Sequence, residues 1–315
     1  MKPRPRASPL FFARDQWQRK PRRWRERRVG GLSLPGGGAL RCYLFSCVAT
    51  TATLAIQGSS LEQCGGPSLL ARMSPSDRVV LVLGGAGTVG SGIVKALLEK
   101  GFQVAVLSRE GGRLEKLKEF LSGSACDRLH TLVGDVGSED GAEAAKRALL
   151  KEVGKVTDVV SSLGFSWWQG GPPLAQSLTE LHRVLDTLLL STFTAWKAFF
   201  PLVKDNPDGS YTFITGGAGE RLLMPGTGFL TLGAAGALAF SLMVREEYPD
   251  VPCKLNELKI NMGVTTPERL GPGYVSHLEV GEAVASLVEK RIVSHTVLSA
   301  NSPADLKTLA LEGKI

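Results

Sequence analysis

The sequence of 315 residues lacks the cysteine and histidine patterns that hold metal ions or build disulfide frameworks. None of its five cysteines forms a C-x-x-C pair: Cys42 and Cys47 stand five positions apart, and Cys64, Cys126 and Cys253 are isolated. The four histidines also lack metal-ligand spacing, namely His130, His182, His277 and His295. We therefore predict no metal site and a reducing compartment, with the cytoplasm as the first choice.

Two further absences exclude other classes of protein. No serine lies in a G-x-S-x-G turn, which argues against an α/β-hydrolase. Excess positive charge is confined to residues 1–72, which hold 13 Lys or Arg and three Asp or Glu. Residues 73–315 hold 24 Lys or Arg and 27 Asp or Glu, a net charge of −3. Because the body of the chain is mildly acidic, the formal charge of +7 predicts no nucleic-acid surface on it.

The N-terminal region, residues 1–72, differs in composition from everything that follows. It is rich in Arg and Pro, then in Gly, and is apolar from Ala39 to Ile56. We interpret it first as a disordered extension; the alternatives are a transit peptide, which would make the protein mitochondrial, and a membrane anchor. Polar residues interrupt the uncharged run 42–61, so the anchor is least favoured. The predicted organisation is this leader followed by one domain over residues 73–315.

One uncharged run, from Leu222 to Val244, has the length of a membrane span. Pro225, Gly226 and Gly228 interrupt its first part, and it lies within a series of alternating strand and helix patterns. We therefore predict a buried or subunit-interface helix over residues 228–248 in place of a membrane span.

From residue 77 onward, short β-branched runs alternate with helical patterns. Strands are predicted at 78–83, 103–107, 130–133, 156–161, 210–215, 254–260 and 295–299. Helices are predicted at 89–100, 113–121, 139–152, 178–204, 228–248 and 279–290. Such alternation requires right-handed crossovers and a parallel sheet with helices on both faces. The sequence thus predicts an α/β fold with a doubly wound parallel seven-stranded sheet, a Rossmann fold.

The strand Val79–Leu83 leads directly into the glycine-rich segment Gly84–Gly90. Glycines at the first, fourth and seventh positions permit a tight turn, close approach of the backbone to phosphate and close packing of the next helix. A second strand ends about twenty residues further on, as in dinucleotide-binding folds. We therefore predict that the pyrophosphate of a nicotinamide dinucleotide is bound by Gly84, Gly87, Thr88, Val89 and Gly90.

The end of the second predicted strand bears on which dinucleotide is bound. An acidic residue there would bind the ribose hydroxyls of NAD, but this sequence has Ser108 and Arg109. A hydroxyl and an arginine suit the extra 2′-phosphate of NADP, so we predict that NADP(H) is favoured over NAD(H). The alternative is that Arg109 is an ordinary surface arginine.

These and later segments resemble the short-chain dehydrogenase/reductase family from about residue 78 to residue 300. The resemblance also rests on Gly134-Asp135-Val136, on the strand end Ser161–Gly164 and on the strand Gly209–Ile214. It implies that Asp135 and Val136 hold the adenine ring. It further implies cofactor contacts from Ser162, Leu163, Gly164 and Thr265.

The resemblance fails at the residues that carry the family's chemistry. Family members transfer a proton with a Tyr whose pKa is lowered by a Lys four residues later, assisted by a Ser and an Asn. The tyrosine needs that cation because its ordinary pKa, about 10, makes it a poor base near neutrality. The four positions fall here on Leu188 for Asn, Gly216 for Ser, Phe229 for Tyr and Gly233 for Lys. No tyrosine of the body has a lysine four residues later, and we predict that the mechanism has been relinquished.

Three functions remain open at this stage. The first is an NADP(H)-binding, reductase-like protein without the usual catalysis, acting as a sensor, scaffold or regulatory subunit. The second is an NADPH-dependent oxidoreductase for a small carbonyl or alcohol, with a non-standard site in which Thr215 could hold a substrate oxygen. The third is a structural interaction protein with a pocket that binds no nucleotide.

Two features bear on ligands and partners. Trp167 and Trp168 follow a predicted strand, in a loop that borders the substrate cleft in the family. The indoles either face a small-molecule ligand or anchor the loop onto the fold. The helix 228–248 resembles the family's dimer-forming helix, which predicts a homodimer or a hetero-oligomer.

Overall fold

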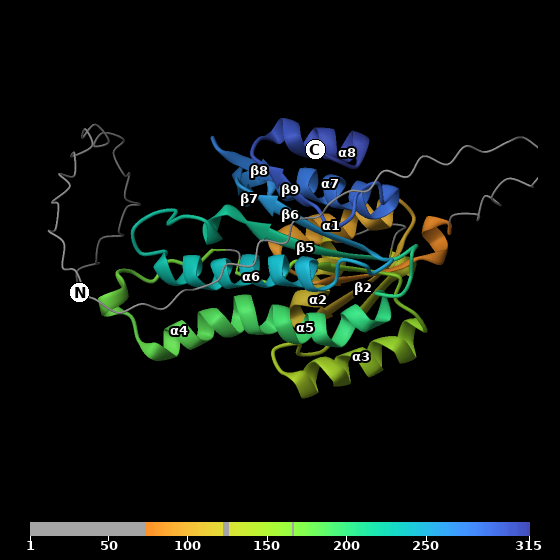
Figure 1. The fold of residues 1–315 in the computed structure, drawn as a ribbon, viewed down its shortest axis with the longest axis horizontal. Coiled ribbons are helices and arrows are strands. Elements are labelled where there is room, and N and C mark those ends of the chain that lie inside the picture. Colours follow the sequence, from red (N-terminus) through yellow and green to blue (C-terminus); the bar gives the residue numbers. More distant parts are fainter. Residues whose placement is uncertain (1–72, 122–125, 166) are drawn as a thin grey trace, which may run out of the picture. The chain divides into compact units, whose positions relative to one another are not determined.

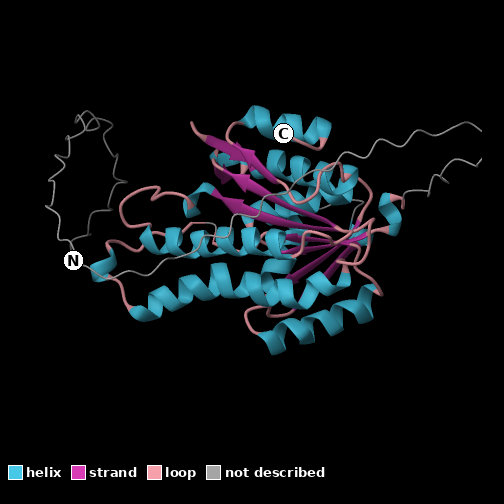
Figure 2. Ribbon diagram, viewed as in Figure 1, coloured by secondary structure: helices cyan, strands magenta, loops and turns pink. Residues whose placement is uncertain are grey.

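The structure is a computed structural model that describes residues 73–121, 126–165 and 167–315. The predictions about the leader, including Cys42, Cys47 and Cys64, lie outside the described residues. Within them, seven strands form one sheet with helices on both faces (Figure 1, Figure 2). The strand order is β3-β2-β1-β4-β5-β6-β9 and every pairing is parallel. The predicted doubly wound Rossmann sheet is confirmed.

The seven strands lie close to their predicted positions. They are β1 (Val79–Leu83), β2 (Gln103–Ser108), β3 (Leu129–Val133), β4 (Asp158–Ser161), β5 (Ser210–Gly216), β6 (Lys254–Ile260) and β9 (Val297–Ala300). All five side chains of β1 are buried, because helices cover both faces of the sheet at its centre. This explains why β1 is a continuous apolar run without a polar alternate face.

The helices divide into two layers. One face of the sheet is covered by α1 (Thr88–Glu99), α7 (His277–Lys290) and α8 (Pro303–Glu312), joined by apolar residues of α2 (Gly111–Leu121). The other is covered by α3 (Glu139–Val153), α5 (Ser191–Phe199) and α6 (Gly228–Glu247). The helix α4 (Leu178–Leu185) continues through a π-helical turn, Asp186–Leu190, into α5. Two buried apolar clusters therefore lie on opposite sides of one sheet.

The structure departs from the sequence predictions at three places. The helix predicted at 178–204 is α4, the π-helical turn and α5 in succession, because the turn adds a residue to the helical repeat. The helix α8 was not predicted, and neither was the small parallel pair β7 (Gly263–Thr265) and β8 (Tyr274–Ser276). Strands of three residues are too short to show a periodic pattern.

Among the described residues, α6 is the helix that is long and apolar enough to cross a membrane by length and composition alone. Phe240 and Val244 of α6 are nevertheless buried in the core beneath the sheet. This packing of α6 against the sheet favours the predicted core or interface role.

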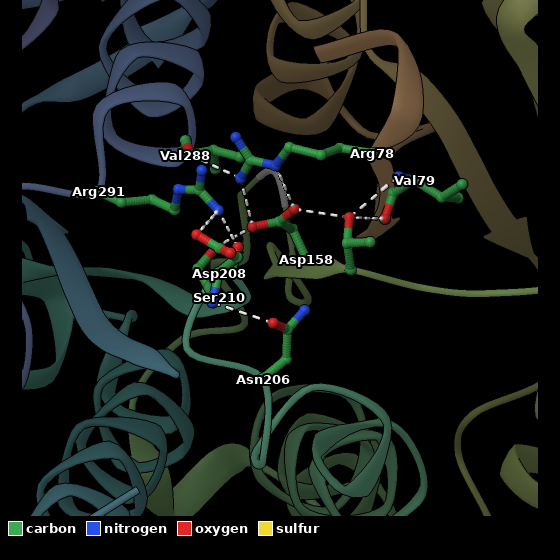
Figure 3. A network of polar contacts seen from close by, with 9 residues as sticks. Arg78, Val79, Asp158, Asn206, Asp208, Ser210, Val288 and Arg291 are labelled. Carbon is green, nitrogen blue, oxygen red and sulfur yellow. Dashed lines mark hydrogen bonds and ion pairs between the residues drawn. The ribbon is translucent and has the colours of Figure 1, made fainter. Parts of the chain in front are cut away.

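A buried polar network joins the strands at their amino-terminal ends (Figure 3). Arg78 donates hydrogen bonds to both carboxylate oxygens of Asp158, at 3.0 and 2.7 Å, and to the carbonyl of Val288 at 2.8 Å. Asp158 also accepts from Ser210 at 2.6 Å and from Thr157 at 2.8 Å. The two charged residues are 2% and 0% exposed. The amino-terminal ends of these strands are therefore fixed by internal contacts, and the cleft lies at their carboxyl ends.

Candidate functional site

A cavity of about 1250 Å³ opens at the carboxyl ends of the strands. Its walls include the ends of β1 and β4, where the chain switches from one half of the sheet to the other, the usual ligand position in such folds. The thirteen residues predicted to contact the dinucleotide all line it: Gly84, Gly87, Thr88, Val89, Gly90, Ser108, Arg109, Asp135, Val136, Ser162, Leu163, Gly164 and Thr265. The fold thus brings together residues from five separate segments of the chain.

The glycine turn after β1 is too crowded to accept a side chain at Gly84 or Gly90. Gly84 has a φ of +74°, a left-handed conformation that favours glycine, and a Cβ there would overlap the carbonyl group of Ser162. A Cβ on Gly90 would overlap the carbonyl oxygen of Gly84. The turn is closed by the amide of Gly87, which donates to the Gly84 carbonyl at 2.9 Å. The backbone itself therefore forms this wall of the cleft.

The amino terminus of α1 faces the cleft without a cap of its own. Its N-cap residue, Gly87, supplies no side-chain hydrogen bond, and no acidic residue lies in the first turn. The first amides of a helix have no acceptor within the helix and carry the positive end of its dipole. This terminus is therefore suited to an anion such as a pyrophosphate.

The end of β2 supplies positive charge to the same cleft. Arg109 lines it, and so does Arg113 of α2, which the sequence analysis missed. The Arg113 guanidinium lies against the glycine turn, where it donates to the Ala86 carbonyl at 3.4 Å. The nearby carboxylate of Glu110 is not among the lining groups. Two guanidinium groups therefore line the cleft at the end of β2.

Three of the four positions predicted to lack the family's catalytic groups, Leu188, Phe229 and Gly233, lie in or against an apolar cluster. Leu188, in the π-helical turn, packs against α6, where a Cβ on Gly233 would lie 2.6 Å from the Leu188 Cδ1 atom. Phe229 is buried with Leu188 in the same cluster. Leu188 and Gly216 line the cavity, whereas Phe229 and Gly233 are not among its lining residues. Hydrocarbon therefore fills the region in which the resemblance places a tyrosine, a lysine and an asparagine.

The two tryptophans have different roles in the structure. Trp168 is 6% exposed, stacks on Phe229 with ring centroids 5.8 Å apart, and donates from Nε1 to Glu180 at 2.5 Å. Trp167 is 53% exposed and lines the cavity. Trp168 thus anchors the loop, and Trp167 faces the space that a ligand would enter.

A buried carboxylate lies behind the cleft wall at Thr215. The Thr215 hydroxyl donates to Glu257 at 2.6 Å, and Glu257 also accepts from Ser241 at 2.8 Å and Arg245 at 2.6 Å. Because the Thr215 proton points to the carboxylate, the hydroxyl oxygen can only accept a hydrogen bond from the cleft. It suits an O–H or N–H of a ligand and does not suit a carbonyl oxygen. This network was not predicted from the sequence, because it joins residues of β5, β6 and α6 that no local pattern relates.

Few groups along the described lining can exchange a proton. The ionisable side chains there are Arg109, Arg113, Arg221, Arg269, Asp135, Asp186 and Tyr274, with no Lys, His or Cys. Arginine stays protonated in proteins and cannot act as an acid or base. Tyr211 lies elsewhere, in the core, where burial raises the pKa of its phenol far above the ordinary value. The described part of the chain also holds no group of three or more His, Cys, Asp or Glu side chains placed for a metal ion.

Residues 78–248 match the family model described as short chain dehydrogenase. A farnesol dehydrogenase from Aedes aegypti is 27% identical over 225 residues, which are 70% of this chain and 88% of that protein. An L-fucose dehydrogenase from Bos taurus is 25% identical over 175 residues, which are 54% of this chain and 60% of that protein.

Two solved structures share the fold. A short-chain dehydrogenase/reductase from Serratia marcescens has a TM-score of 0.62 at 19% identity, over 72% of this chain and 97% of that one. The structure of ElxO with NADP bound also has a TM-score of 0.62, at 17% identity, over 70% of this chain and 96% of that one. At these identities the likeness concerns the fold alone.

Proposed function

The chain belongs to the short-chain dehydrogenase family, and on that premise we propose that it binds NADP(H) without using the family's proton-transfer groups. In this proposal it acts as a cofactor-dependent sensor, scaffold or regulatory subunit. One observation carries the proposal: a complete cradle for a dinucleotide lies beside an apolar cluster at Leu188, Phe229 and Gly233. The family's nicotinamide cofactor is the ligand that such a cradle fits.

The apolar cluster bears on the chemistry because carbonyl reduction needs a proton as well as a hydride. The hydride leaves negative charge on the substrate oxygen, which a positioned acid must neutralise. Phe229 has no hydroxyl, and Gly233 has no ammonium group to lower the pKa of one. The Leu188 side chain occupies the space beside Gly233, so a chain of waters has no polar partners there.

The preference for NADP(H) rests on charge at the end of β2. Arg109 and Arg113 line the cleft, and the carboxylate that would bind ribose hydroxyls of NAD is replaced by Ser108 and Arg109. A hydrogen bond to a charged group contributes about 1.5–3 kcal/mol, equivalent to about tenfold or more in affinity. We therefore propose that NADPH binds at least about tenfold more tightly than NADH.

Calorimetric titration of the full chain with NADPH and NADH tests this proposal directly. The variant Arg109→Glu should weaken NADPH binding by about tenfold to a hundredfold and leave NADH binding nearly unchanged. Arg147→Glu is the matched control, since Arg147 is exposed on α3 and lies outside the cavity. Binding of neither dinucleotide would refute the proposal and leave a structural interaction protein as the better account.

A second candidate function is an NADPH-dependent oxidoreductase acting on a small carbonyl or alcohol. It is favoured by the dehydrogenase relatives and by two hydroxyl groups in the cleft: Thr215 can accept a hydrogen bond from an alcohol, and Tyr274 can donate one to a carbonyl oxygen. Positioning of substrate against cofactor alone can contribute several kcal/mol to a rate. A panel of carbonyl compounds, followed by NADPH absorbance, decides between the candidates: turnover that Arg109→Glu abolishes supports the oxidoreductase, and no turnover across the panel opposes it.

We also propose that α6 forms a subunit interface, in a homodimer or a hetero-oligomer. Leu232, Leu242 and Met243 of α6 and Phe193 of α5 are exposed apolar side chains on neighbouring helices. Light scattering on the purified full chain should give a dimer mass that Leu242→Lys reduces to a monomer. A monomer at all concentrations, with no change in the variant, would leave only a hetero-oligomer to be sought.

The cytoplasm is the proposed location, and mitochondria are the alternative if residues 1–72 direct import. Imaging of the full chain fused at its C-terminus to a fluorescent protein distinguishes the two. A mitochondrial signal that disappears when the chain starts at Met73 would overturn the cytoplasmic assignment.

A further inference from the structure

The cavity is larger than a single ligand needs. Pockets for one small molecule usually have about 300–1,000 Å³, whereas this one has about 1250 Å³. The residues assigned to the dinucleotide account for the walls around β1, β2 and β4. Beyond them the cavity extends between the segment that follows β5 and the segment that joins β7 to β8. We call this extension the distal cleft and define it by Arg221, Leu223, Met224, Arg269 and Tyr274.

Two arginines line the distal cleft, Arg221 and Arg269. Arg221 belongs to the loop before α6, and Arg269 lies in the β7–β8 connection. No hydrogen bond or ion pair joins either guanidinium to another described residue. The neighbouring Glu220 is already paired with Lys259 at 2.5 Å, and it does not line the cavity.

The charge of the distal cleft is therefore positive. Backbone hydrogen bonding holds the pKa of the Glu268 carboxyl below its usual range, and the neighbouring Arg269 adds a smaller effect in the same direction. Glu268 does not line the cavity. Asp186 is the one carboxylate of the described lining on this side, since Asp135 lies at the adenine end. Two arginines against one aspartate leave a net of +1, which favours an anionic ligand.

The remaining walls of the distal cleft are apolar and exposed. Leu223, Met224 and Tyr274 are large side chains on its rim, and Trp167 adds an indole from the loop after β4. Exposed apolar groups gathered around a cavity mark a binding site for an apolar body.

We infer that the distal cleft binds an amphipathic organic anion, whose head is held by Arg221 and Arg269 and whose hydrocarbon body lies against Trp167, Leu223 and Met224. A carboxylate and a phosphate monoester each offer two oxygens that can accept two parallel hydrogen bonds from one guanidinium. The inference rests on the proposed function in one respect, because it assigns the other part of the cavity to the dinucleotide.

Calorimetry on the full chain tests the inference with decanoate and decyl phosphate as probes, each with and without saturating NADPH. Decanol tests the need for charge, and acetate and inorganic phosphate test the need for a hydrocarbon body. We expect one or both decyl anions to bind at least about tenfold more tightly than decanol, acetate or phosphate. The ratio between decanoate and decyl phosphate identifies the head group.

The variants Arg221→Gln and Arg269→Gln should each weaken binding of the decyl anion by about tenfold, with less than about a twofold effect on NADPH. Arg147→Gln is the control and should change neither affinity. Equal binding of decanol and the anions, or anion binding unchanged in both variants, overturns the inference while NADPH binding stands. If the unmodified chain does not bind NADPH, the proposed function is refuted. Binding of a decyl anion that depends on Arg221 and Arg269 would in that case still support the distal cleft as a binding site.

Discussion

The substitution Gly233→Ala in α6 tests whether Leu188 fills the space that a side chain at position 233 needs. In an open helical position, replacing Gly with Ala stabilises a protein by about 0.5–1 kcal/mol. Here the new Cβ would lie 2.6 Å from the Leu188 Cδ1 atom and 3.1 Å from Val184 Cγ1. Since overpacking a core costs about 1–3 kcal/mol, we expect a net loss of up to about 2 kcal/mol in the free energy of unfolding.

The companion substitution Leu188→Ala reverses the sign of that effect. Alone, it should destabilise the protein by about 2–5 kcal/mol, because Leu188 is buried and its removal leaves a cavity. In this background the Leu188 Cδ1 atom is gone. The nearest neighbours of the new Cβ are then the Cβ of residue 188 and Val184 Cγ1, both at 3.1 Å, so Gly233→Ala should recover most of the ordinary helical gain. The double variant should therefore be more stable than the sum of the single effects by about 1–3 kcal/mol.

Urea unfolding of the four proteins, followed by circular dichroism, measures this coupling. Gly112→Ala in α2 is the control, because a Cβ at Gly112 meets nothing within 4 Å. It should behave identically with and without Leu188→Ala. If Gly233→Ala stabilises the native protein and its effect adds simply to that of Leu188→Ala, then Leu188 does not occupy the vacant position and the account of the apolar cluster is refuted.

Three other measurements test the structure away from the cleft. Asp158→Asn should lower the free energy of unfolding by about 3–5 kcal/mol, since it leaves the Arg78 guanidinium buried without its counter-ion; a loss below about 1 kcal/mol in urea would contradict the network of Figure 3. Burial lowers the pKa of His277, so the folded state holds it neutral and stability should fall as the pH drops below about 6.5, a fall that His277→Gln should reduce in thermal melts. Burial raises the pKa of the Cys253 thiol to about 11, so iodoacetamide at neutral pH should modify Cys253 only in urea, as peptide mass spectrometry would show.

Much of the fold could be predicted because its signals are local. The strands β1 and β2 are short runs rich in valine, and the glycine turn Gly84–Gly90 predicts both its own shape and the helix after it. The same locality explains the prediction of Ser108 and Arg109 at the cleft, since the end of a parallel strand next to the switch point must lie there. Local patterns were therefore sufficient for the glycine turn and for Ser108 and Arg109, whereas the resemblance predicted Asp135, Val136, Ser162, Leu163, Gly164 and Thr265.

The remaining features depend on contacts between residues far apart in the chain. The stacking of Trp168 on Phe229 and the position of Leu188 beside Gly233 follow from how α4 and α6 pack, which no pattern within either helix reveals. Arg113 was missed because one turn of helix carries it back over the glycine turn. Sequence reasoning located the substituted positions through resemblance, but the structure was needed to show that hydrocarbon fills them.

The four substitutions make physical sense as a group. A lysine introduced at Gly233 alone would place an ammonium group against Leu188 and Val184, where it would lack a partner and lose its hydration. A tyrosine at Phe229 alone would stand without the cation that lowers the pKa of its phenol. Each single reversal is therefore unfavourable or useless unless the others accompany it. The glycines of the turn are present, because a side chain at Gly84 or Gly90 would overlap the neighbouring backbone whether or not a phosphate is bound. In the proposed function, such a chain binds the cofactor and lacks the coupled groups that would use it.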